Sequence, residues 1–304
     1  MKSVNTTLRN LVLALGLTGS LFSLPVAAEP SVTAAATQQQ LACACFEVSV
    51  VGDGPAVILI PGLASSGEVW QSTVAALKTD YQLHVLTLAG FAGVKPLPAH
   101  AWEAGYLVSQ QHAILRYIDE QQLKKPVIVG HSLGGYLALA IAASAPDKIA
   151  GAVNVDGLPA LGLLFAQAAA SNEGNNAAPA SFDPMALAKN MTNNESWHQR
   201  IVNDMFRSDG MTSGRVMGEL MQADLRPQLA SLQVPVLTLG ALQHGAPYST
   251  PAQVQANFEQ QFTTAPTAYH RFAFAADSKH FIMADAPAWL QQQLQQFLTA
   301  QMQD

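Results

Sequence analysis

Short apolar blocks alternate along the chain with longer amphipathic segments. The continuous apolar run at residues 56–60 favours a strand that is buried on both faces of a parallel sheet. Residues 46–51 alternate in the manner of a half-buried strand, and a Gly-Asp-Gly-Pro turn signal separates the two. Further strands are predicted at residues 82–88, in the run that begins at Val127, and at 149–155, 234–239 and 267–274. Helices are predicted at about 68–79, 103–122, 137–143, 251–262 and 288–303.

This alternation of strands and helices predicts an α/β fold, with a mostly parallel sheet and helices on both of its faces. The alternation of strands and helices is interrupted at about residues 158–231, which show no clear strand and contain a flexible stretch at 171–183. We interpret this segment as a helical cap inserted into the sheet domain. It is rich in methionine, with Met185, Met191, Met205, Met211, Met217 and Met221.

The N-terminal residues carry the pattern of a secretory signal peptide. Lys2 and Arg9 give a positively charged start, residues 11–24 are apolar, and residues 26–28 are small enough for cleavage. We therefore expect residues 1–28 to be removed, residues 29–42 to form a disordered lead-in, and residues 43–304 to form the folded domain. The mature protein is expected to be periplasmic or secreted, with no stable membrane insertion.

Composition narrows the classes of partner. Charged residues make up 12% of the 304 residues and hydrophobic residues 49%, so the chain has ample material for a large core. The formal net charge of −6 and the lack of a basic stripe argue against binding of nucleic acid or anionic lipid.

The sequence leaves open whether Cys43 and Cys45 are bridged, and it offers no paired ligand pattern for a metal. It leaves the oligomeric state open as well.

A Gly-x-Ser-x-Gly motif at residues 130–134 is the strongest chemical signal. A β-branched run precedes the motif and a helical pattern of small residues follows it, and this order is the context expected of a nucleophile elbow. Ser132 would stand at the tip of a tight turn, at the N-terminus of a helix whose free N–H groups favour negative charge. We predict that Ser132 is a nucleophile and that the N–H of Leu133 is an oxyanion donor.

A serine nucleophile needs a base and an orienting carboxylate. His280 follows the last predicted strand, at the sheet edge that also carries Ser132, and is our predicted base. The other histidines are assigned to strands, helices or the surface, with His244 on the surface and His131 pointing away from the site. They are His84, His100, His112, His131, His198, His244 and His270.

The acid should lie between the serine and the histidine in the chain. The loop after residues 234–239, where an acid is often expected, reads Gly-Ala-Leu-Gln-His-Gly and holds none. Asp156 ends the strand that follows the elbow helix, so we predict it as the acid, with Asp277 and Asp285 as alternatives. The N–H of Leu63, after Pro61 and Gly62, is predicted to complete the oxyanion hole. Possible walls of the substrate pocket are Trp70, Phe91 and Tyr136.

These residues resemble the α/β-hydrolase superfamily, and within it the capped esterases and the proline-iminopeptidase-like and haloperoxidase-like hydrolases. The resemblance covers about residues 46–297 except the cap, and its motifs are Pro61-Gly62-Leu63, Gly130-His131-Ser132-Leu133-Gly134-Gly135, Lys279-His280-Phe281 and Asp285-Ala286-Pro287. It implies a sheet of about eight strands, the catalytic and oxyanion roles given above, and no cofactor. Two departures are Pro61, where many members have histidine, and the missing acid after residues 234–239.

The expected activity is hydrolysis of a carboxylic ester with a small or medium apolar acyl group, through an acyl-enzyme intermediate. An amide or lactone hydrolase, or an aminopeptidase, on the same triad is the alternative within the enzymes. A non-catalytic exported binding protein on the same fold is the alternative of another class. The partner is in each case a small molecule, and the fold does not identify it.

Overall fold

The computed structural model describes residues 45–164, 182–245 and 249–302 of the chain. The predicted signal peptide, the lead-in, Cys43 and most of the predicted flexible stretch lie outside these residues. No helix within the described ranges is both long enough and apolar enough to cross a membrane.

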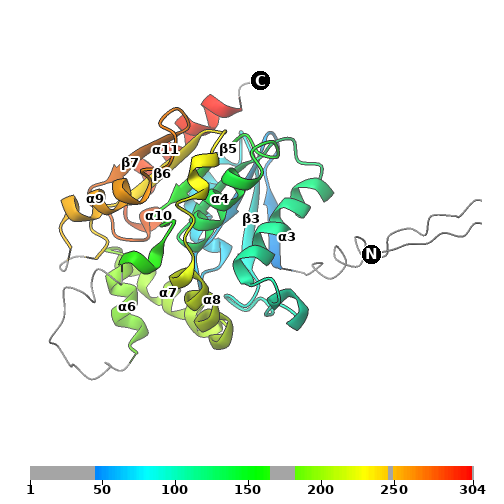
Figure 1. Cartoon of the computed structure of the whole chain (residues 1–304). Helices are drawn as coiled ribbons and strands as arrows, with labels where there is room; N and C mark the ends of the chain where they lie inside the picture. Colours follow the sequence, from blue (N-terminus) through cyan, green and yellow to red (C-terminus); the bar gives the residue numbers. More distant parts are fainter. Residues whose placement is uncertain (1–44, 165–181, 246–248, 303–304) are drawn as a thin grey trace, which may run out of the picture.

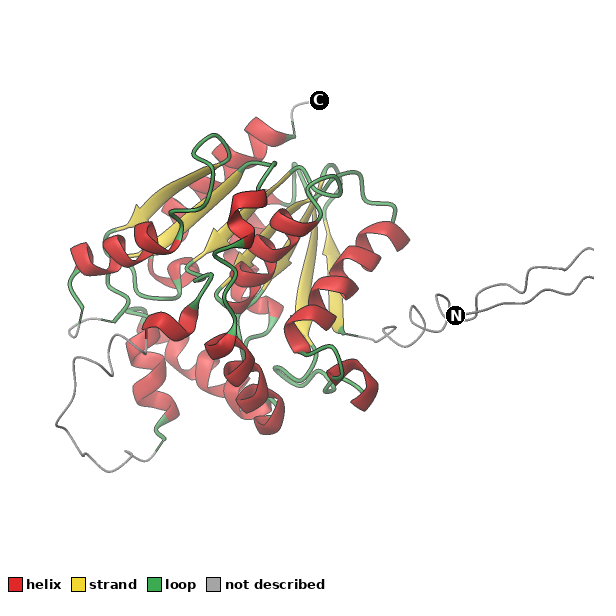
Figure 2. Ribbon diagram, viewed as in Figure 1, coloured by secondary structure: helices red, strands yellow, loops and turns green. Residues whose placement is uncertain are grey.

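A single mostly parallel sheet forms the centre of the molecule (Figure 2). Its strands are β1 (Phe46–Val51), β2 (Ala56–Ile60), β3 (Gln82–Leu88), β4 (Val127–His131), β5 (Gly151–Val155), β6 (Val236–Ala241) and β7 (His270–Ala275). They lie in the order β1-β3-β2-β4-β5-β6-β7, and only the β1–β3 pair is antiparallel. The mostly parallel α/β fold is confirmed, with seven strands in the described residues where about eight were expected.

Helices cover both faces of this sheet (Figure 1). One face packs against α3 (Tyr106–Glu120), α4 (Leu133–Ser144) and α9 (Pro251–Gln261), and the other against α2 (Gln71–Leu77) and α11 (Pro287–Gln301). The remaining short elements are α10 (Ile282–Asp285) and the 3-10 turns η1 (Gly67–Trp70), η2 (Ala99–Trp102) and η3 (Gln228–Ser231).

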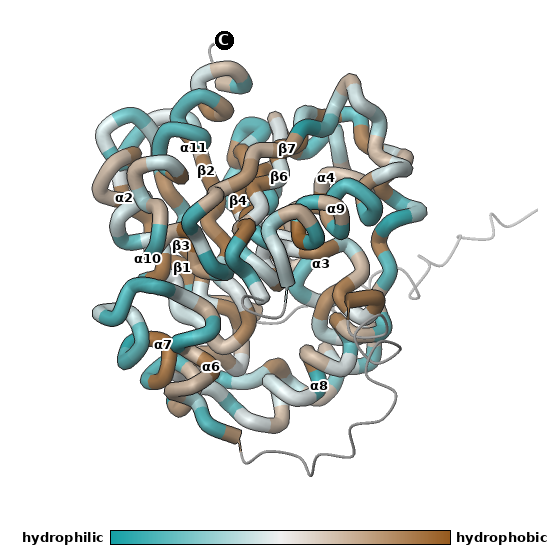
Figure 3. The backbone as a smooth tube through the Cα atoms, turned by 90° about the vertical axis from the view of Figure 1, so that its left-hand side faces the viewer, coloured by the Kyte–Doolittle hydropathy of each residue, from teal (hydrophilic) through white to brown (hydrophobic). Residues whose placement is uncertain are grey.

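The period-2 geometry of the strands divides the core into two apolar layers. In β2, Ile58 and Ile60 join the layer beneath α3 and α4, whereas Val57 and Leu59 join the layer beneath α2 and α11. All five residues of β2 are buried, as expected for a central strand covered on both faces. Figure 3 shows the hydrophobic segments gathered in these strands, with polar segments on the outer helices.

The described part of the insertion between β5 and β6 is helical. It contains α6 (Pro184–Met191), α7 (Glu195–Arg207) and α8 (Gly210–Gln222), which lie together beyond one end of the sheet (Figure 1). Side chains of Asp183, Asn194 and Asp209 accept hydrogen bonds from the first-turn N–H groups of these helices. The buried carboxylate of Asp204 on α7 accepts hydrogen bonds from the backbone N–H and the hydroxyl of Ser66, which join the insertion to the loop after β2.

Candidate active site

Ser132 occupies the turn between β4 and α4. Its backbone has φ 55° and ψ −114°, a region that non-glycine residues rarely adopt, and its N–H donates to the carbonyl of Val155. The turn needs glycine on either side, because a Cβ on Gly130 would overlap the Gly134 carbonyl and one on Gly134 would overlap the Ile60 carbonyl. The strand, the serine turn and the helix therefore pack as closely as a nucleophile elbow requires.

The loop after β2 lies against this turn. A Cβ on Gly62 would come within 3.2 Å of the Ser132 Cβ and 3.0 Å of the His131 Nδ1. The next residue, Leu63, is thus close to the serine turn in space. Leu133 is the first residue of α4, so its N–H has no carbonyl partner within the helix. The two predicted oxyanion donors come from loops that meet at Ser132.

Asp156 and His280 form a buried pair, although they are 124 positions apart in the chain. The Nδ1 of His280 donates to Oδ2 of Asp156 at 2.6 Å. The second carboxylate oxygen accepts from the N–H of Ala241 at 2.8 Å, and the N–H of Asp156 donates to the carbonyl of Leu239. The carboxylate is therefore held between the ends of β5 and β6, directed at the ring of His280.

Asn154 shapes the turn that carries this acid. Its side-chain amide donates to the carbonyl of Gly157 and its amide oxygen accepts from the N–H of Gly157. Asp156 between them has φ 52°, a second strained non-glycine residue at the site. Asn154 was not predicted as a site residue, because a buried asparagine within a strand gives no signal of its partners.

The two alternative acids make other contacts. Asp285 accepts through Oδ2 from the N–H of Lys279 and through Oδ1 from the N–H groups of Asn193 and Asn194, so its carboxylate joins the insertion to the loop of His280. The side chain of Asp277 is exposed, and the backbone carbonyl of that residue accepts from Asn193. The geometry therefore pairs His280 with Asp156 among the three candidates.

His131 does not point away from the site, and that expectation was wrong. Its ring is buried, lies 4.5 Å from the ring of His280 between centroids, and donates through Nε2 to the His280 carbonyl at 3.0 Å. Adjacent side chains at the sharp turn diverge, but the loop of His280 lies on the side that His131 faces. This hydrogen bond thus joins the Ser132 turn to the loop that carries His280.

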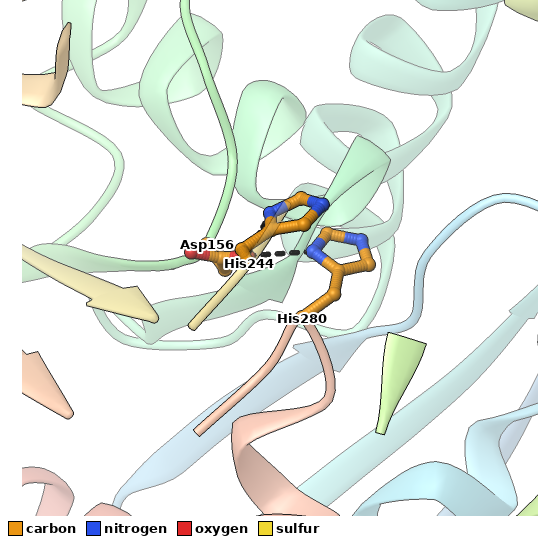
Figure 4. Close-up of side chains that lie close together, drawn as sticks. All are labelled: Asp156, His244 and His280. Carbon is orange, nitrogen blue, oxygen red and sulfur yellow. Dashed lines mark hydrogen bonds and ion pairs between the residues drawn. The ribbon is translucent and has the colours of Figure 1, made fainter. Parts of the chain in front are cut away.

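His244 is also not a plain surface residue. It follows β6, and its Nδ1 lies 2.9 Å from the same Oδ2 atom of Asp156 that His280 contacts. The rings of His244 and His280 are 4.5 Å apart, and Figure 4 shows both converging on Asp156. This contact depends on the register of β5 with β6, which the sequence does not reveal.

The three groups shift one another's pKa. Burial alone would raise the pKa of Asp156, but the charge and hydrogen bonds of His244 and His280 hold it well below its usual range. Burial and the charge of His244 lower the pKa of His280 against the opposing effect of Asp156. Burial opposes a charge on His244, but Asp156 outweighs it and raises the pKa of His244. At neutral pH the site thus holds an ionised Asp156 beside a neutral His280.

The donor atoms of Asp156, His244 and His280 all lie within 4.8 Å of one another, which raises the question of a metal site. Two ligands of a tetrahedral zinc ion are about 3.3 Å apart, given bond lengths near 2 Å. The 2.6 Å between His280 and Asp156 is shorter than that and fits a hydrogen bond. This arrangement suits a hydrogen-bonded pair rather than metal ligation.

Two of the three predicted pocket residues belong to the core. Trp70 is fully buried in the layer beneath α2 and α11, and Phe91 is fully buried beside Tyr106 in the opposite layer, so neither presents a surface to a substrate. Both are large apolar residues next to predicted loops, a position where burial and ligand contact give the same sequence signal. Tyr136, in the first turn of α4, is only partly buried.

The methionines of the insertion divide into packed and exposed residues. Met185, Met191 and Met205 pack against the core, whereas Met211 and Met217 are exposed.

The chain is similar to known proteins in both sequence and fold. The sequence profile described as the alpha/beta hydrolase family matches residues 57–302. Pimeloyl-[acyl-carrier protein] methyl ester esterases are similar over a shorter stretch. The protein from Vibrio parahaemolyticus is 31% identical over 108 residues, 36% of this chain and 39% of that protein, and that from Vibrio atlanticus is 33% identical over 110 residues. The match thus spans about two fifths of the length of these curated relatives.

Solved structures share the fold at low sequence identity. An esterase from Thermogutta terrifontis aligns with a TM-score of 0.67 at 17% identity, over 84% of this chain and 94% of that one. A putative aryl esterase from Burkholderia cenocepacia aligns with a TM-score of 0.66 at 21% identity, over 85% and 96%. Since the family profile covers most of the chain and the same fold recurs in these structures, the chain belongs to the alpha/beta hydrolase family.

Proposed function

We propose that the protein is a serine hydrolase that cleaves a carboxylic ester with a small or medium apolar acyl group. The observation that carries this proposal is the buried 2.6 Å contact of His280 with Asp156, beside the strained turn of Ser132. The names of the Vibrio relatives favour an ester over an amide as the substrate. The position of the pair at the carboxyl ends of the strands, where α/β sheets bind their ligands, supports it further.

In the proposed reaction, the Ser132 hydroxyl attacks the ester carbonyl and His280 takes its proton at Nε2. Asp156 accepts from Nδ1 of His280, which fixes the tautomer with a free Nε2 and stabilises the imidazolium that forms. The N–H groups of Leu63 and Leu133 would stabilise the negative charge on the carbonyl oxygen. His280 then protonates the leaving alcohol, and a water molecule activated by the same base releases the acid and restores Ser132.

Turnover of p-nitrophenyl acyl esters of increasing chain length tests the proposal. Ser132→Ala and His280→Ala should each lower kcat by about 10⁴-fold or more, and Asp156→Asn by about 10⁴-fold, because these groups act as one unit. Asp277→Asn is the matched control and should retain activity, since that side chain is exposed.

Other outcomes would separate the alternatives. Full activity of a folded Asp156→Asn variant would contradict the assignment of the acid. If the protein turns over aminoacyl amides or lactones but no acyl esters, its substrate is an amide or a lactone and not the proposed ester. A wild-type protein that neither turns over any of these compounds nor reacts at Ser132 with a fluorophosphonate would contradict the whole proposal.

A further inference from the structure

The carboxylate of Asp156 is shared between two histidines, and the reaction proposed above uses only one. Oδ2 faces Nδ1 of His280 at 2.6 Å and Nδ1 of His244 at 2.9 Å, while Oδ1 accepts from the Ala241 N–H. Three donors therefore fix the two carboxylate oxygens. They are His244 from the loop after β6, Ala241 from the end of β6, and His280 from the loop after β7. His244 lies in the loop in which the sequence analysis expected an acid and found none.

We propose that His244 is a positioning residue, which holds the Asp156 carboxylate beside His280 and keeps His280 unprotonated at more acidic pH. The inference rests on the proposed function, because it concerns the base of that reaction. It assigns a role to a histidine that makes no contact with the reacting atoms in the proposed mechanism.

The positioning effect follows from the hydrogen bonds. The Ala241 N–H holds Oδ1, and Oδ2 accepts from both His280 and His244, so His244 adds a second donor that limits movement of the oxygen bound to His280. The side chain of Asp156 is fully buried, so its carboxylate depends on donors from the protein.

The effect on the base follows from charge. The ring of His244 lies 4.5 Å from that of His280, so a protonated His244 repels a second proton on His280. Asp156 raises the pKa of His244, so His244 keeps its charge over the pH range in which His280 titrates. The charge of His244 in turn lowers the pKa of His280. The base then remains neutral, and active, as the pH falls.

Other titratable groups near His280 do not reproduce this effect. His131, from the end of β4, is buried with its pKa lowered to about 3, so it carries no charge near neutral pH. Lys279 directs its Nζ to the carbonyl of Lys189 in the insertion, and Asp285 on α10 binds backbone N–H groups of the loops around it. Among the residues that the structure describes, the charged groups that face the ring of His280 are thus Asp156 and His244.

Two variants separate the two effects. His244→Gln keeps a side-chain N–H donor but removes the charge, and His244→Phe removes both. In each, the acidic limb of the kcat/KM profile should move to higher pH by about one pH unit. The plateau kcat should stay within about threefold of wild type in His244→Gln and fall further in His244→Phe. His112→Gln, an exposed histidine on α3, is the matched control and should leave the profile unchanged.

Titration of the ¹³Cε1-labelled histidines by NMR distinguishes failure of this inference from failure of the proposed function. If the titration midpoint of His280 rises in His244→Gln, the inference is supported, even in a protein that hydrolyses none of the esters tested. If that midpoint and the acidic limb are both unchanged in a folded His244→Gln variant, the inference is overturned.

Discussion

Two residues that the proposed reaction uses have strained backbones. Ser132 and Asp156 have φ values of 55° and 52°, and Ala64, next to the predicted oxyanion donor Leu63, has 53°. Non-glycine residues in such regions cost about 1–3 kcal/mol each and persist where the surrounding structure enforces them. Here that structure is the tight glycine packing around Ser132 and the Asn154 hydrogen bonds around Asp156.

Relief of this strain should stabilise an inactive protein. Ser132→Gly should unfold at a temperature about 2–4 °C above Ser132→Ala, because glycine adopts a positive φ freely while alanine keeps the Cβ. The measurement is the thermal midpoint of the two inactive variants by circular dichroism.

A helical position serves as the control for this comparison. Ser213 lies inside α8, so Ser213→Gly should be less stable than Ser213→Ala by about 1 kcal/mol. If Ser132→Gly is also less stable than Ser132→Ala, strain at Ser132 is contradicted.

At the scale of elements, the contact between α7 and the loop after β2 joins the insertion to the sheet domain. Oδ2 of Asp204 accepts from the Ser66 N–H at 2.8 Å and from its hydroxyl at 2.7 Å, and both residues are buried. The loop that carries Ser66 also carries Leu63, so the contact holds the insertion against the segment of the predicted oxyanion hole.

Loss of this contact should lower stability. Asp204→Ala leaves the buried N–H and hydroxyl of Ser66 without an acceptor and should reduce the free energy of unfolding by about 1–3 kcal/mol in urea denaturation. Ser66→Ala removes only one of the two bonds and should cost less. The double variant should cost less than the sum, because both bonds share one acceptor.

The exposed Asp147, replaced by alanine, is the control and should change stability by less than about 0.5 kcal/mol. Strict additivity of Asp204→Ala and Ser66→Ala would show that the two residues do not interact.

The elements themselves were largely predictable from the sequence. Strands β1, β2 and β3 have the predicted bounds, because strong turn signals or periodic segments flank them. Helix α3 was predicted from residue 103 but starts at Tyr106, since η2 and Gly105 with φ 83° precede it. Turn signals and hydrophobic periodicity involve residues that are close in the chain, so they can be recognised without knowledge of the fold.

The contacts of the site were less predictable. Asp156 and His280 were identified from their places after strands, which fixes the sheet edge but not the distance between them. The roles of His131 and His244 were missed because each depends on segments that are far apart in the chain. The Nε2 of His131 donates to the carbonyl of His280, which is 149 positions away in the chain. His244 contacts Asp156 because β5 pairs with β6.

At the scale of the whole molecule, buried neutral histidines should make the fold sensitive to acid. Burial lowers the pKa of His131 to about 3 and that of His270 to about 4, and it lowers those of His84 and His280 as well. In the unfolded chain a histidine binds its proton near pH 6.5. Between about pH 6.5 and these folded values the unfolded state binds more protons, so stability falls as the pH falls.

The thermal midpoint should therefore decrease from pH 6.5 towards pH 4. Each fully buried histidine contributes about 1.4 kcal/mol per pH unit over its window. His131→Gln should make the decrease shallower between these pH values, while His112→Gln should not alter it. His244 acts in the opposite sense, because its raised pKa adds stability that is lost as the pH rises above 6.5. A His131→Gln protein with the wild-type slope would contradict this account.

The separation of 124 positions between Asp156 and His280 has a consequence for the order of folding. The Ser132 turn needs only segments that precede the insertion, because its strand pairs with β2 and β5 and its N–H donates to the carbonyl of Val155. The proposed base, His280, must instead wait until β6 has paired with β5 across the whole insertion and the last loop has docked, and such distant contacts form slowly. During synthesis the chain exposes its serine long before a base can reach it. The proposed hydrolytic activity is then acquired only with completion of the fold, and partly folded chains carry Ser132 without its proposed base.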